Sequence, residues 1–579
     1  MDITTKSKYS KEFQPVENIA KLSLYAVPQS LTPVDLYLDG NEGTPPDVTD
    51  IIPSLLLKKG LLNRYPSVAE LEETIASKLG IDANRVMVTA GGDEAIDRAC
   101  RIALDEKRNA VIPSPAFCMY EHYALLAGSA IKKVEWTEPD FPVDSYIDAI
   151  DENTGLIVIA SPNNPTGYVI NPYYISRLAE AAPYALIVLD LAYEEFADIK
   201  LTSLALNFPN CLVLRTFSKA WGLAGLRIGY AIGSSENINW LRKAGGPYSV
   251  SSLSIYLAMA VMNGNKLTML QYVEDVKENR QQIYDCLKQL GAEPVLSQAN
   301  FVFARFKNTD WVRRGLAGLG IKVRAFPDTS DLADALRITC PPEEHQDRLI
   351  HALQTVMKPE AILFDLDGVI ADVSESYHQA IIRVGESYGI VITIDQIAEL
   401  KAGGNANNDW ELTQLILNRA GLNLPLPVII ERFEAIYQGN ADEPGLWEKE
   451  KLLISKFFLN QLRSLVVLGI VTGRPKQDAC RFLTRFDLLD IFYTVICLDD
   501  ASPKPSPEPV KKALANFRVK RAWMIGDNPD DIQAARNANV LPLGIVAPGV
   551  DNEIMGTALL KAGAAKILNS IEELKELLK

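Results

Sequence analysis

The chain has 579 residues, of which 48% are hydrophobic and 23% are charged, and 73 acidic against 58 basic residues give a net charge of −15. This composition is that of an ordinary globular protein, and it excludes collagen-like, disordered and small disulfide-stapled folds. The acidic balance argues against nucleic acid or an anionic membrane as the main partner, because both attract basic proteins. The length predicts about three to five domain-sized units, at roughly 100–200 residues each.

The cysteines and the first residues predict a cytoplasmic protein. Seven cysteines are spread along the chain without a CxxC pair, which favours reduced thiols. The chain has only four histidines and no Cys/His cluster, so no zinc site is expected. Residues 1–20 lack the apolar core of a signal peptide. Apolar runs end after about eight residues, too few to cross a membrane.

In the first part of the chain, up to residue 357, short apolar strands alternate with helical stretches. The expected strands cover residues 85–88, 109–112, 155–159, 186–189 and 211–214. Such alternation predicts an α/β fold with a mostly parallel sheet and helices on both faces. The residues Pro341-Pro342-Glu343-Glu344 then begin an expected helix that ends near Val356, with proline at an early position and acids in its first turn.

A domain boundary is expected near residue 358. A strand over 361–364 follows Lys358-Pro359-Glu360, and a mainly helical stretch covers about 376–460. Strand–helix alternation then resumes, with expected strands over 465–471, 495–498 and 522–525. Because the connector is so short, the halves 1–357 and 358–579 are expected to pack against each other.

A lysine beside two hydroxyl groups lies in the first half, in Thr216-Phe217-Ser218-Lys219, with Arg227 eight residues after the lysine. A lysine of this kind can bind a carbonyl cofactor covalently while its neighbours hold the cofactor's phosphate. Alone, the motif is weak, because most lysines are simply solvated.

Other segments of the first half fit the same chemistry. Asp190 ends a strand, where a carboxylate can stabilise a protonated pyridine nitrogen. Gly92 and Asp93 lie between a strand and a helix, where free backbone N–H groups bind phosphate. The turn around Asn164 and the ring of Phe117 can complete a cofactor site, although a turn and a core phenylalanine are the ordinary interpretations.

In this order, the segments resemble the pyridoxal-phosphate-dependent aminotransferases of fold type I over about residues 15–355, and more narrowly the histidinol-phosphate aminotransferases. Residues 38–42, 63–66 and 336–339 also resemble the sequence motifs of this family. The resemblance implies a large domain over about 36–250 with a mostly parallel sheet. It also implies a small α+β domain made of the N-terminal arm and about 251–357. Pyridoxal 5'-phosphate, glutamate, a small phosphorylated substrate and a homodimer are implied as well.

The resemblance also implies a role for individual residues. Lys219 is the Schiff-base lysine and moves the proton, while Asp190 pairs with the pyridine nitrogen. The other residues expected to hold the cofactor are Gly92, Asp93, Phe117, Asn164, Tyr193, Thr216, Ser218 and Arg227, with Tyr65 reaching the cofactor of the other subunit. Those expected to bind substrate are Tyr25, Asn41, Arg324 and Arg337, since a guanidinium suits phosphate and carboxylate alike.

Of the departures from the family pattern, which include Ala90 where some members have arginine or serine, two concern the substrate pocket. The text Asn41-Glu42-Gly43-Thr44 stands where Asn-Glu-Asn-Pro is usual, and Phe117 stands where tyrosine is common. Both line the expected substrate pocket. An aromatic aminotransferase and a phosphoamino-acid decarboxylase therefore remain alternatives for the first half.

Two aspartates, Asp365 and Asp367, directly follow the first strand of the second half. A carboxylate can attack phosphorus, and a second acid two residues later can protonate the leaving oxygen and activate water. Alone, this text also fits a calcium loop or a plain turn. Three further segments follow in order, at 471–474, 502–505 and 525–531.

Together these four motifs resemble those of the haloacid dehalogenase superfamily over about residues 360–550. The resemblance implies a Rossmann-like α/β domain with a helical cap over about 376–460. Asp365 is then the nucleophile, Asp367 the acid and base, and Thr472 and Lys504 bind the phosphoryl group. The implied Mg²⁺ ligands are Asp365, Asp367, Asp527 and Asp531. Asp367 also argues against a true dehalogenase, which needs no such acid.

The two halves predict consecutive steps of histidine synthesis. The first would convert imidazole-acetol phosphate and glutamate into L-histidinol phosphate, and the second would hydrolyse that phosphomonoester to histidinol. The match of the second half to this substrate rests on its adjacency to the first. Two alternatives stay open: another small phosphoester, such as phosphoglycolate or pyridoxal phosphate, and a regulatory or assembly role.

Overall fold

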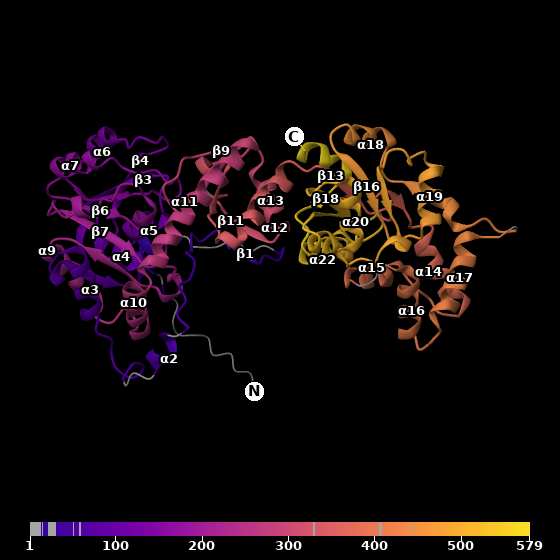
Figure 1. Ribbon diagram of the computed structural model, residues 1–579, viewed down its shortest axis with the longest axis horizontal. Helices are drawn as coiled ribbons and strands as arrows, with labels where there is room; N and C mark the ends of the chain where they lie inside the picture. The colour runs from indigo at the N-terminus through magenta and orange to yellow at the C-terminus, as the bar shows by residue number, and fades with distance from the viewer. Residues whose placement is uncertain are drawn as a thin grey trace.

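The computed structural model describes residues 13, 15–20, 22, 31–49, 51–56, 60–327, 330–404, 408–440 and 442–578. Figure 1 shows three bodies in a row, with a small domain between a large N-terminal domain and the C-terminal half. Of the helices in these ranges, none is long and apolar enough to cross a membrane.

The large domain is built on a seven-stranded sheet with the order β2-β8-β7-β6-β5-β3-β4. Every strand is parallel to the others except β8, which runs antiparallel to β2 and β7. The strands are β2 (Val86–Thr89), β3 (Asn109–Ser114), β4 (Ala130–Glu135), β5 (Thr154–Ala160), β6 (Leu186–Asp190), β7 (Cys211–Thr216) and β8 (Gly229–Ile232).

The five strands predicted for this domain are confirmed, whereas β4 and β8 were not predicted. Strand β4 lies at the sheet edge, and its sequence AIKKVE is largely exposed, so it lacks the apolar run of a central strand. The principal helices beside the sheet are α3 (Ala69–Leu79), α4 (Gly91–Ala103), α5 (Cys118–Leu126), α6 (Val143–Ala149), α7 (Pro172–Ala181), α9 (Ser235–Lys243) and α10 (Ser252–Gly264).

The small domain has a five-stranded sheet with the order β1-β11-β12-β10-β9. Strand β1 pairs in parallel with β11, and the other pairs are antiparallel. The strands are β1 (Leu36–Leu38), β9 (Glu293–Pro294), β10 (Phe301–Arg305), β11 (Ile321–Ala325) and β12 (Ala335–Thr339), and the helices are α11 (Lys266–Gln289), α12 (Thr309–Gly318) and α13 (Gln346–Met357).

The division between the large and small domains differs from the prediction at two places. Residues 36–38 were expected in the large domain, but β1 hydrogen-bonds to β11, with Leu36 opposite Ile321. Helix α10 was expected in the small domain, but it packs against α2 (Ile51–Leu56) and α3 of the large domain. The helix predicted from Pro341 begins instead as a single 3₁₀ turn over Glu343–His345 before α13.

The C-terminal half contains a six-stranded, fully parallel sheet with the order β17-β16-β13-β18-β19-β20. Its strands are β13 (Ala361–Phe364), β16 (Val467–Val471), β17 (Thr494–Ile496), β18 (Ala522–Gly526), β19 (Leu541–Ile545) and β20 (Ile567–Leu568). Its helices are α18 (Lys456–Arg463), α19 (Lys476–Arg485), α20 (Glu508–Phe517), α21 (Pro529–Asn537), α22 (Asn552–Ala562) and α23 (Leu574–Leu577). Because β13, β16 and β18 are adjacent and parallel, the motifs that follow them meet at one edge.

A helical insert leaves and rejoins this half through a two-stranded ribbon. Strand β14 (Ala371–Asp372) pairs with β15 (Lys451–Leu452), and four helices lie between them in the chain. These are α14 (Tyr377–Ser387), α15 (Ile394–Ala402), α16 (Asp409–Arg419) and α17 (Leu426–Gln438). In Figure 1, α14, α16 and α17 lie at the end of the molecule farthest from the large domain. We call these four helices the cap.

The two halves pack closely, as the short connector predicted. The Trp311 ring of α12 meets the Trp523 ring of β18 edge-on, with centroids 5.1 Å apart. The Trp523 indole N–H donates to the carbonyl of Thr355 in α13 at 2.7 Å. One continuous apolar core joins the small domain to the C-terminal sheet. The segment before β1 also contacts the C-terminal half, since the Thr32 hydroxyl donates to the carbonyl of Ala564 at 3.0 Å.

Replacing Trp523 by alanine is expected to lower the free energy of unfolding by about 3–5 kcal/mol, because Trp523 is fully buried and its loss leaves a cavity. Scanning calorimetry should show the transition of the C-terminal half at a lower temperature. Trp240, which is 47% exposed, is the matched control. A Trp523→Ala protein that melts like Trp240→Ala would contradict an interface that stabilises the fold.

Candidate active sites

A cavity of about 1200 Å³ lies between the large and small domains, at the carboxyl ends of the large-domain strands. The predicted residues that line it are Asn41, Gly92, Asp93, Phe117, Asn164, Asp190, Tyr193, Thr216, Ser218, Lys219, Arg227, Arg324 and Arg337. Tyr65 does not line this cavity. It is 81% exposed, stacks on Tyr248 with centroids 4.6 Å apart, and lines a separate cavity of about 640 Å³. Tyr25 lies outside the described residues.

Lys219 enters the large cavity from the loop that follows β7. Its ammonium donates to the carbonyl of Gly40 at 3.0 Å and lies 5.6 Å from the centre of the Tyr193 ring. Gly43 passes so close that a Cβ there would sit 1.9 Å from the carbonyl oxygen of Lys219. The departure from the family pattern at position 43 therefore has a steric reason, because the backbone beside the lysine leaves no room for a side chain.

Asp190 ends β6 and points its carboxylate into the same cavity. The Tyr120 hydroxyl donates to its Oδ2 at 2.6 Å, and the backbone N–H of Ala192 donates to its Oδ1 at 3.1 Å. Burial raises the pKa of Asp190, and the bond from Tyr120 opposes the rise. A buried carboxylate held by two donors suits the protonated ring nitrogen of a cofactor.

Tyr120 is a site residue that the sequence prediction missed. It lies three residues after Phe117, at the start of α5. Positions three apart share one face of a helix, so this spacing is the signal that could have placed both rings at the cavity. In the structure the two rings meet edge-on, with centroids 5.7 Å apart.

One end of the cavity is lined by donors for an anion. Arg227 adopts a left-handed backbone, with φ 49°, and its Nη2 lies 3.0 Å from Asp93 at the start of α4. The hydroxyl of Thr216 donates to that of Ser218 at 2.9 Å. Hydroxyls, a guanidinium and the first N–H groups of a 13-residue helix form a suitable phosphate cradle.

Two arginines of the small domain also line the cavity. Arg324 and Arg337 are direct cross-strand partners on β11 and β12. Arg337 donates to Asn164 Oδ1 at 2.6 Å and to the carbonyl of Asp39 at 2.5 Å. Asn41 is held close by, donating to the Tyr193 hydroxyl at 3.0 Å. The cavity therefore offers cationic groups for a second anion besides the cofactor phosphate. With Lys219 and Asp190, its residues fit pyridoxal phosphate.

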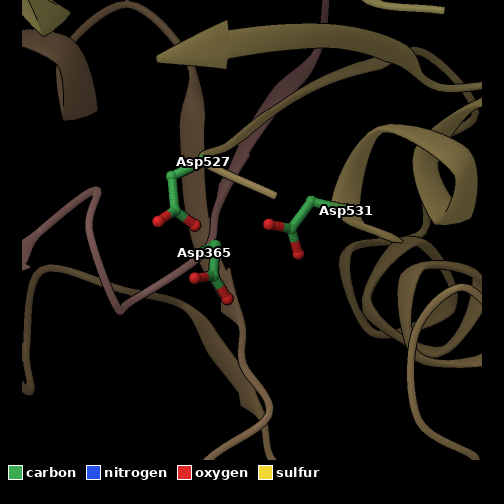
Figure 2. A group of neighbouring side chains, drawn as sticks. All are labelled: Asp365, Asp527 and Asp531. Atoms are coloured by element: carbon green, nitrogen blue, oxygen red, sulfur yellow. The ribbon is translucent and has the colours of Figure 1, made fainter. Parts of the chain in front are cut away.

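A second site lies at the carboxyl edge of the C-terminal sheet. Asp365 follows β13, Asp527 follows β18, and Asp531 lies in α21, with one carboxylate oxygen of each within 4.8 Å of the others. Figure 2 shows the three aspartate side chains grouped together. Lys504 donates to Asp365 Oδ1 at 2.6 Å and also contacts Asp531. Three acids against one lysine leave negative charge, and hard oxygen donors suit Mg²⁺.

The charges of this site are buried together. Burial raises the pKa of Asp365 to about 7, while the Lys504 ammonium opposes the rise. Thr472, at the end of β16, is also buried, and its Oγ1 accepts from the backbone N–H of Arg474 at 3.1 Å. Lys504 thus contacts Asp365, and it also donates to the carbonyl of Val471, the residue before Thr472, at 3.3 Å.

Asp367 was predicted as a metal ligand, but its carboxylate is not in the three-aspartate cluster. The physical reason is an ion pair, because Arg474 Nε donates to Asp367 Oδ1 at 2.6 Å. The Asp367 side chain is thereby held against Arg474 and outside the three-aspartate cluster.

Three charged residues near the second site were not predicted. Arg474 belongs to the motif at 471–474 but had no assigned role, and Glu450 precedes β15 without any recognisable motif. Lys401 of α15 pairs with Asp409 at 3.1 Å. Although burial disfavours its charge, Asp409 and Asp527 raise the pKa of Lys401. The cap therefore places a cation beside the acidic cluster.

Comparison with known proteins agrees with this geometry. Residues 34–353 match the family model of class I and II aminotransferases, and residues 362–545 match that of haloacid dehalogenase-like hydrolases. A histidinol-phosphate aminotransferase of Thermoanaerobacter sp. is 33% identical over 310 residues, which cover 52% of this chain and 87% of that protein.

A second relative and a solved structure add to this comparison. An imidazoleglycerol-phosphate dehydratase of Phytophthora nicotianae is 43% identical over 197 residues, 33% of this chain and 44% of that protein. The crystal structure of histidinol-phosphate aminotransferase from Sinorhizobium meliloti with pyridoxal-5'-phosphate superposes with a TM-score of 0.54 at 22% identity. It covers 60% of this chain and 99% of that one, and it shows the shared fold.

Proposed function

Because the chain belongs to the class I and II aminotransferase family and also carries a haloacid dehalogenase-like hydrolase domain, we propose that it catalyses two consecutive steps of histidine biosynthesis. The N-terminal half transfers the amino group of glutamate to imidazole-acetol phosphate, which gives L-histidinol phosphate. The C-terminal half hydrolyses histidinol phosphate to histidinol. The observation that carries the proposal is the presence, in one chain, of a cavity with two separate sets of anion-binding groups and a phosphomonoester site.

At the first site, pyridoxal phosphate supplies, when bound, the electron sink that stabilises charge at the substrate's α-carbon. The Lys219 amine is the base that takes and returns the proton there. The hydrogen bond from Tyr120 holds the Asp190 carboxylate, which faces the ring nitrogen and stabilises its positive charge. Arg227, Thr216 and Ser218 hold the phosphate of the cofactor. Arg324 and Arg337 take either the carboxylate of glutamate or the phosphate of the ketone, so one pocket serves both substrates in turn.

Replacing Tyr120 by phenylalanine is expected to lower kcat/KM for transamination about 10- to 100-fold, because Asp190 loses a charge-assisted hydrogen bond. Steady-state kinetics with glutamate measure the loss. Tyr146→Phe is the matched control, since the Tyr146 hydroxyl contacts only the carbonyl of Val158, at 3.3 Å, among the described residues. Equal activities in the two variants would contradict a role for Tyr120 at the cofactor site.

At the second site, Asp365 attacks the phosphorus of the substrate, and the bond from phosphorus to the leaving oxygen breaks. Lys504 and Thr472 hold the phosphoryl oxygens. Asp367 gives a proton to the leaving oxygen and then takes one from the water that hydrolyses the aspartyl phosphate. Mg²⁺, when bound by Asp365, Asp527 and Asp531, offsets the negative charge of the acids and the phosphate.

The relatives support the choice of pathway. The relative with 33% identity is named for histidinol phosphate, and another relative is named as the dehydratase of imidazoleglycerol phosphate. Loss of water from the glycerol side chain of that compound yields a ketone, which is the amino acceptor proposed here. Hydrolysis of a phosphomonoester in water is close to irreversible. It would therefore draw the reversible transamination toward histidinol.

We also place the enzyme in the cytoplasm, as a homodimer in which Tyr65 reaches the cavity of the other subunit. The exposed Tyr65 ring and its neighbouring cavity support this arrangement. Sedimentation equilibrium should give twice the mass of one chain, and a monomer that still transaminates at full rate would contradict the dimer.

The phosphatase assignment is tested by supplying the pure protein with Mg²⁺ and a panel of phosphate esters. Histidinol phosphate, phosphoglycolate and pyridoxal phosphate represent the competing substrates. We expect kcat/KM to be at least about tenfold higher for histidinol phosphate, a difference of about 1.4 kcal/mol in transition-state binding. A clear preference for phosphoglycolate or pyridoxal phosphate would overturn the assignment.

A further inference from the structure

A buried arginine joins two carboxylates at the junction of the cap and the C-terminal sheet. The side chain of Arg474 is only 1% exposed. Its Nε donates to Asp367 Oδ1 at 2.6 Å, and its Nη2 lies 2.5 Å from the same oxygen. Its Nη1 donates to Glu450 Oε2 at 3.0 Å. The guanidinium therefore lies between the predicted acid of the reaction and a second carboxylate that the reaction does not use.

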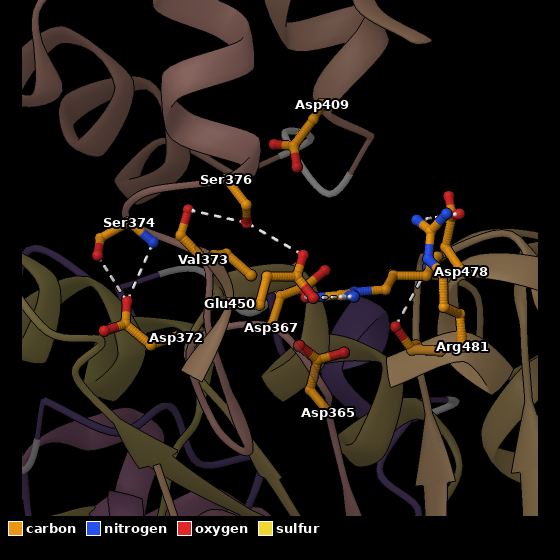
Figure 3. A network of polar contacts seen from close by, with 12 residues as sticks. Asp365, Asp367, Asp372, Val373, Ser374, Ser376, Asp409, Glu450, Asp478 and Arg481 are labelled. Atoms are coloured by element: carbon orange, nitrogen blue, oxygen red, sulfur yellow. Dashed lines mark hydrogen bonds and ion pairs between the residues drawn. The ribbon is translucent and has the colours of Figure 1, made fainter. Parts of the chain in front are cut away.

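Glu450 connects this arginine to the cap. Its other oxygen, Oε1, accepts from the Ser376 hydroxyl at 3.1 Å and from the Tyr437 hydroxyl at 3.0 Å. Ser376 directly precedes α14, Tyr437 lies in α17, and Glu450 directly precedes the ribbon strand β15. Figure 3 shows Ser376, Glu450 and Asp367 along one path of polar contacts. The path thus begins at the residue before α14 and on α17, and it ends on Asp367.

The surroundings hold the guanidinium in one orientation. It lies 5.0 Å from the centre of the Tyr377 ring and 5.3 Å from that of Phe482. A planar guanidinium fork has a fixed donor geometry, unlike the flexible ammonium of lysine. A buried charge without a partner is strongly destabilising, so the arginine and its two carboxylates keep one another in place.

From these contacts we propose that Arg474 is a positioning residue for the acid–base group Asp367. We further propose that Glu450 makes this position depend on a seated cap. The proposal rests on the phosphatase activity proposed above. Both contacts of Arg474 are to Oδ1 of Asp367, which leaves Oδ2 as the oxygen that exchanges a proton with the substrate and with water. That proton passes to the leaving oxygen as the bond from Asp365 to phosphorus forms, and a proton from the attacking water later replaces it.

Two substrates with different leaving groups can distinguish a positioning role for Arg474 from a purely structural role. The alkoxide of an alkyl phosphate needs a proton to leave, whereas p-nitrophenolate leaves without one. The second half of the reaction needs Asp367 as a base for either ester. A variant with a misplaced Asp367 should therefore release p-nitrophenol in a normal first turnover and then stall.

The experiment compares Arg474→Gln and Glu450→Gln with the wild type on histidinol phosphate and p-nitrophenyl phosphate. For histidinol phosphate, Arg474→Gln should lower kcat about 100-fold, and Glu450→Gln about tenfold, with little change in KM. With p-nitrophenyl phosphate, both should show a first-turnover burst of near one equivalent at the wild-type rate, followed by slow turnover.

Arg485→Gln is the matched control. Arg485 donates to the carbonyls of Trp447 and Glu448 at 3.0 and 2.7 Å in the same region, but no described contact joins its side chain to Tyr437, Glu450 or Asp367. It should keep wild-type kinetics with both esters. If Arg474→Gln does not fold, the double variant Ser376→Ala, Tyr437→Phe removes only the cap's hold on Glu450. It should lower kcat for histidinol phosphate several-fold and leave the burst unchanged.

If the variants lose burst rate and turnover equally with p-nitrophenyl phosphate, the proposal is overturned. Arg474 would then have only a structural role. If the wild type hydrolyses a different alkyl phosphate instead, only the substrate assignment fails. The same comparison then uses that ester. If it hydrolyses no alkyl phosphate, the proposed function and this inference fail together. Transamination by each variant reports whether the chain has folded.

Discussion

Replacing Lys219 by alanine should abolish transamination and leave phosphate release unchanged. Among the described residues, the lysines that line the cavity beside Asp190 are Lys219 and Lys133, and Lys133 is paired with Glu121. Because Lys219 both binds the cofactor and moves the proton, its removal should lower kcat at least about 10⁴-fold, by analogy with other covalent catalysts. Production of 2-oxoglutarate from glutamate measures the loss.

Two controls make the Lys219 result specific. Borohydride reduction followed by mass spectrometry should add the mass of the cofactor to the wild type, on the peptide that contains Lys219, and not to the variant. The exposed Lys243 provides a surface control, since it contacts only the Trp240 ring among the described residues. Transamination by Lys219→Ala at more than about one-hundredth of the wild-type rate would contradict the assignment of the base.

Replacing Asp365 by asparagine should abolish phosphate release and leave transamination unchanged. The amide has nearly the same shape as the carboxylate, so the contact with Lys504 can be largely kept. An amide oxygen is a poor nucleophile toward phosphorus, and we expect a loss of at least about 10³-fold in kcat. Release of inorganic phosphate from histidinol phosphate measures it.

The control for this prediction is Asp372→Asn, the same substitution on strand β14. Asp372 accepts hydrogen bonds only from Ser374 among the described contacts, so hydrolysis should be unchanged. The Asp365→Asn protein also tests a regulatory role for this half. Altered transamination or assembly in that variant, with phosphate release intact, would favour regulation over catalysis.

The predictions that succeeded depend on short motifs at strand ends. Asp190, Lys219, Asp365 and Asp527 each follow or end a central apolar strand, and parallel strands bring such positions to one edge. The backbone pattern alone therefore brings them together. The strands that were missed, such as β4, have exposed faces or few residues, so their sequences lack a long apolar run.

The missed site residues are those whose role comes from distant partners. Tyr120 acts through Asp190, which is 70 residues away, and Arg474 acts through Asp367 and Glu450. Asp367 was placed among the metal ligands because its motif holds two aspartates, and only the ion pair with Arg474 separates their roles. Gly43 appeared as a departure from a family pattern, and only the backbone of Lys219 explains it.

The central claim is that one chain carries out both steps, and a coupled assay tests it most directly. The full chain is given imidazole-acetol phosphate, glutamate, pyridoxal phosphate and Mg²⁺. We expect 2-oxoglutarate, histidinol and inorganic phosphate to be produced in equal amounts, with Lys219→Ala blocking all three and Asp365→Asn blocking only the last two. Accumulation of histidinol phosphate by the wild type, without release of phosphate, would contradict the claim.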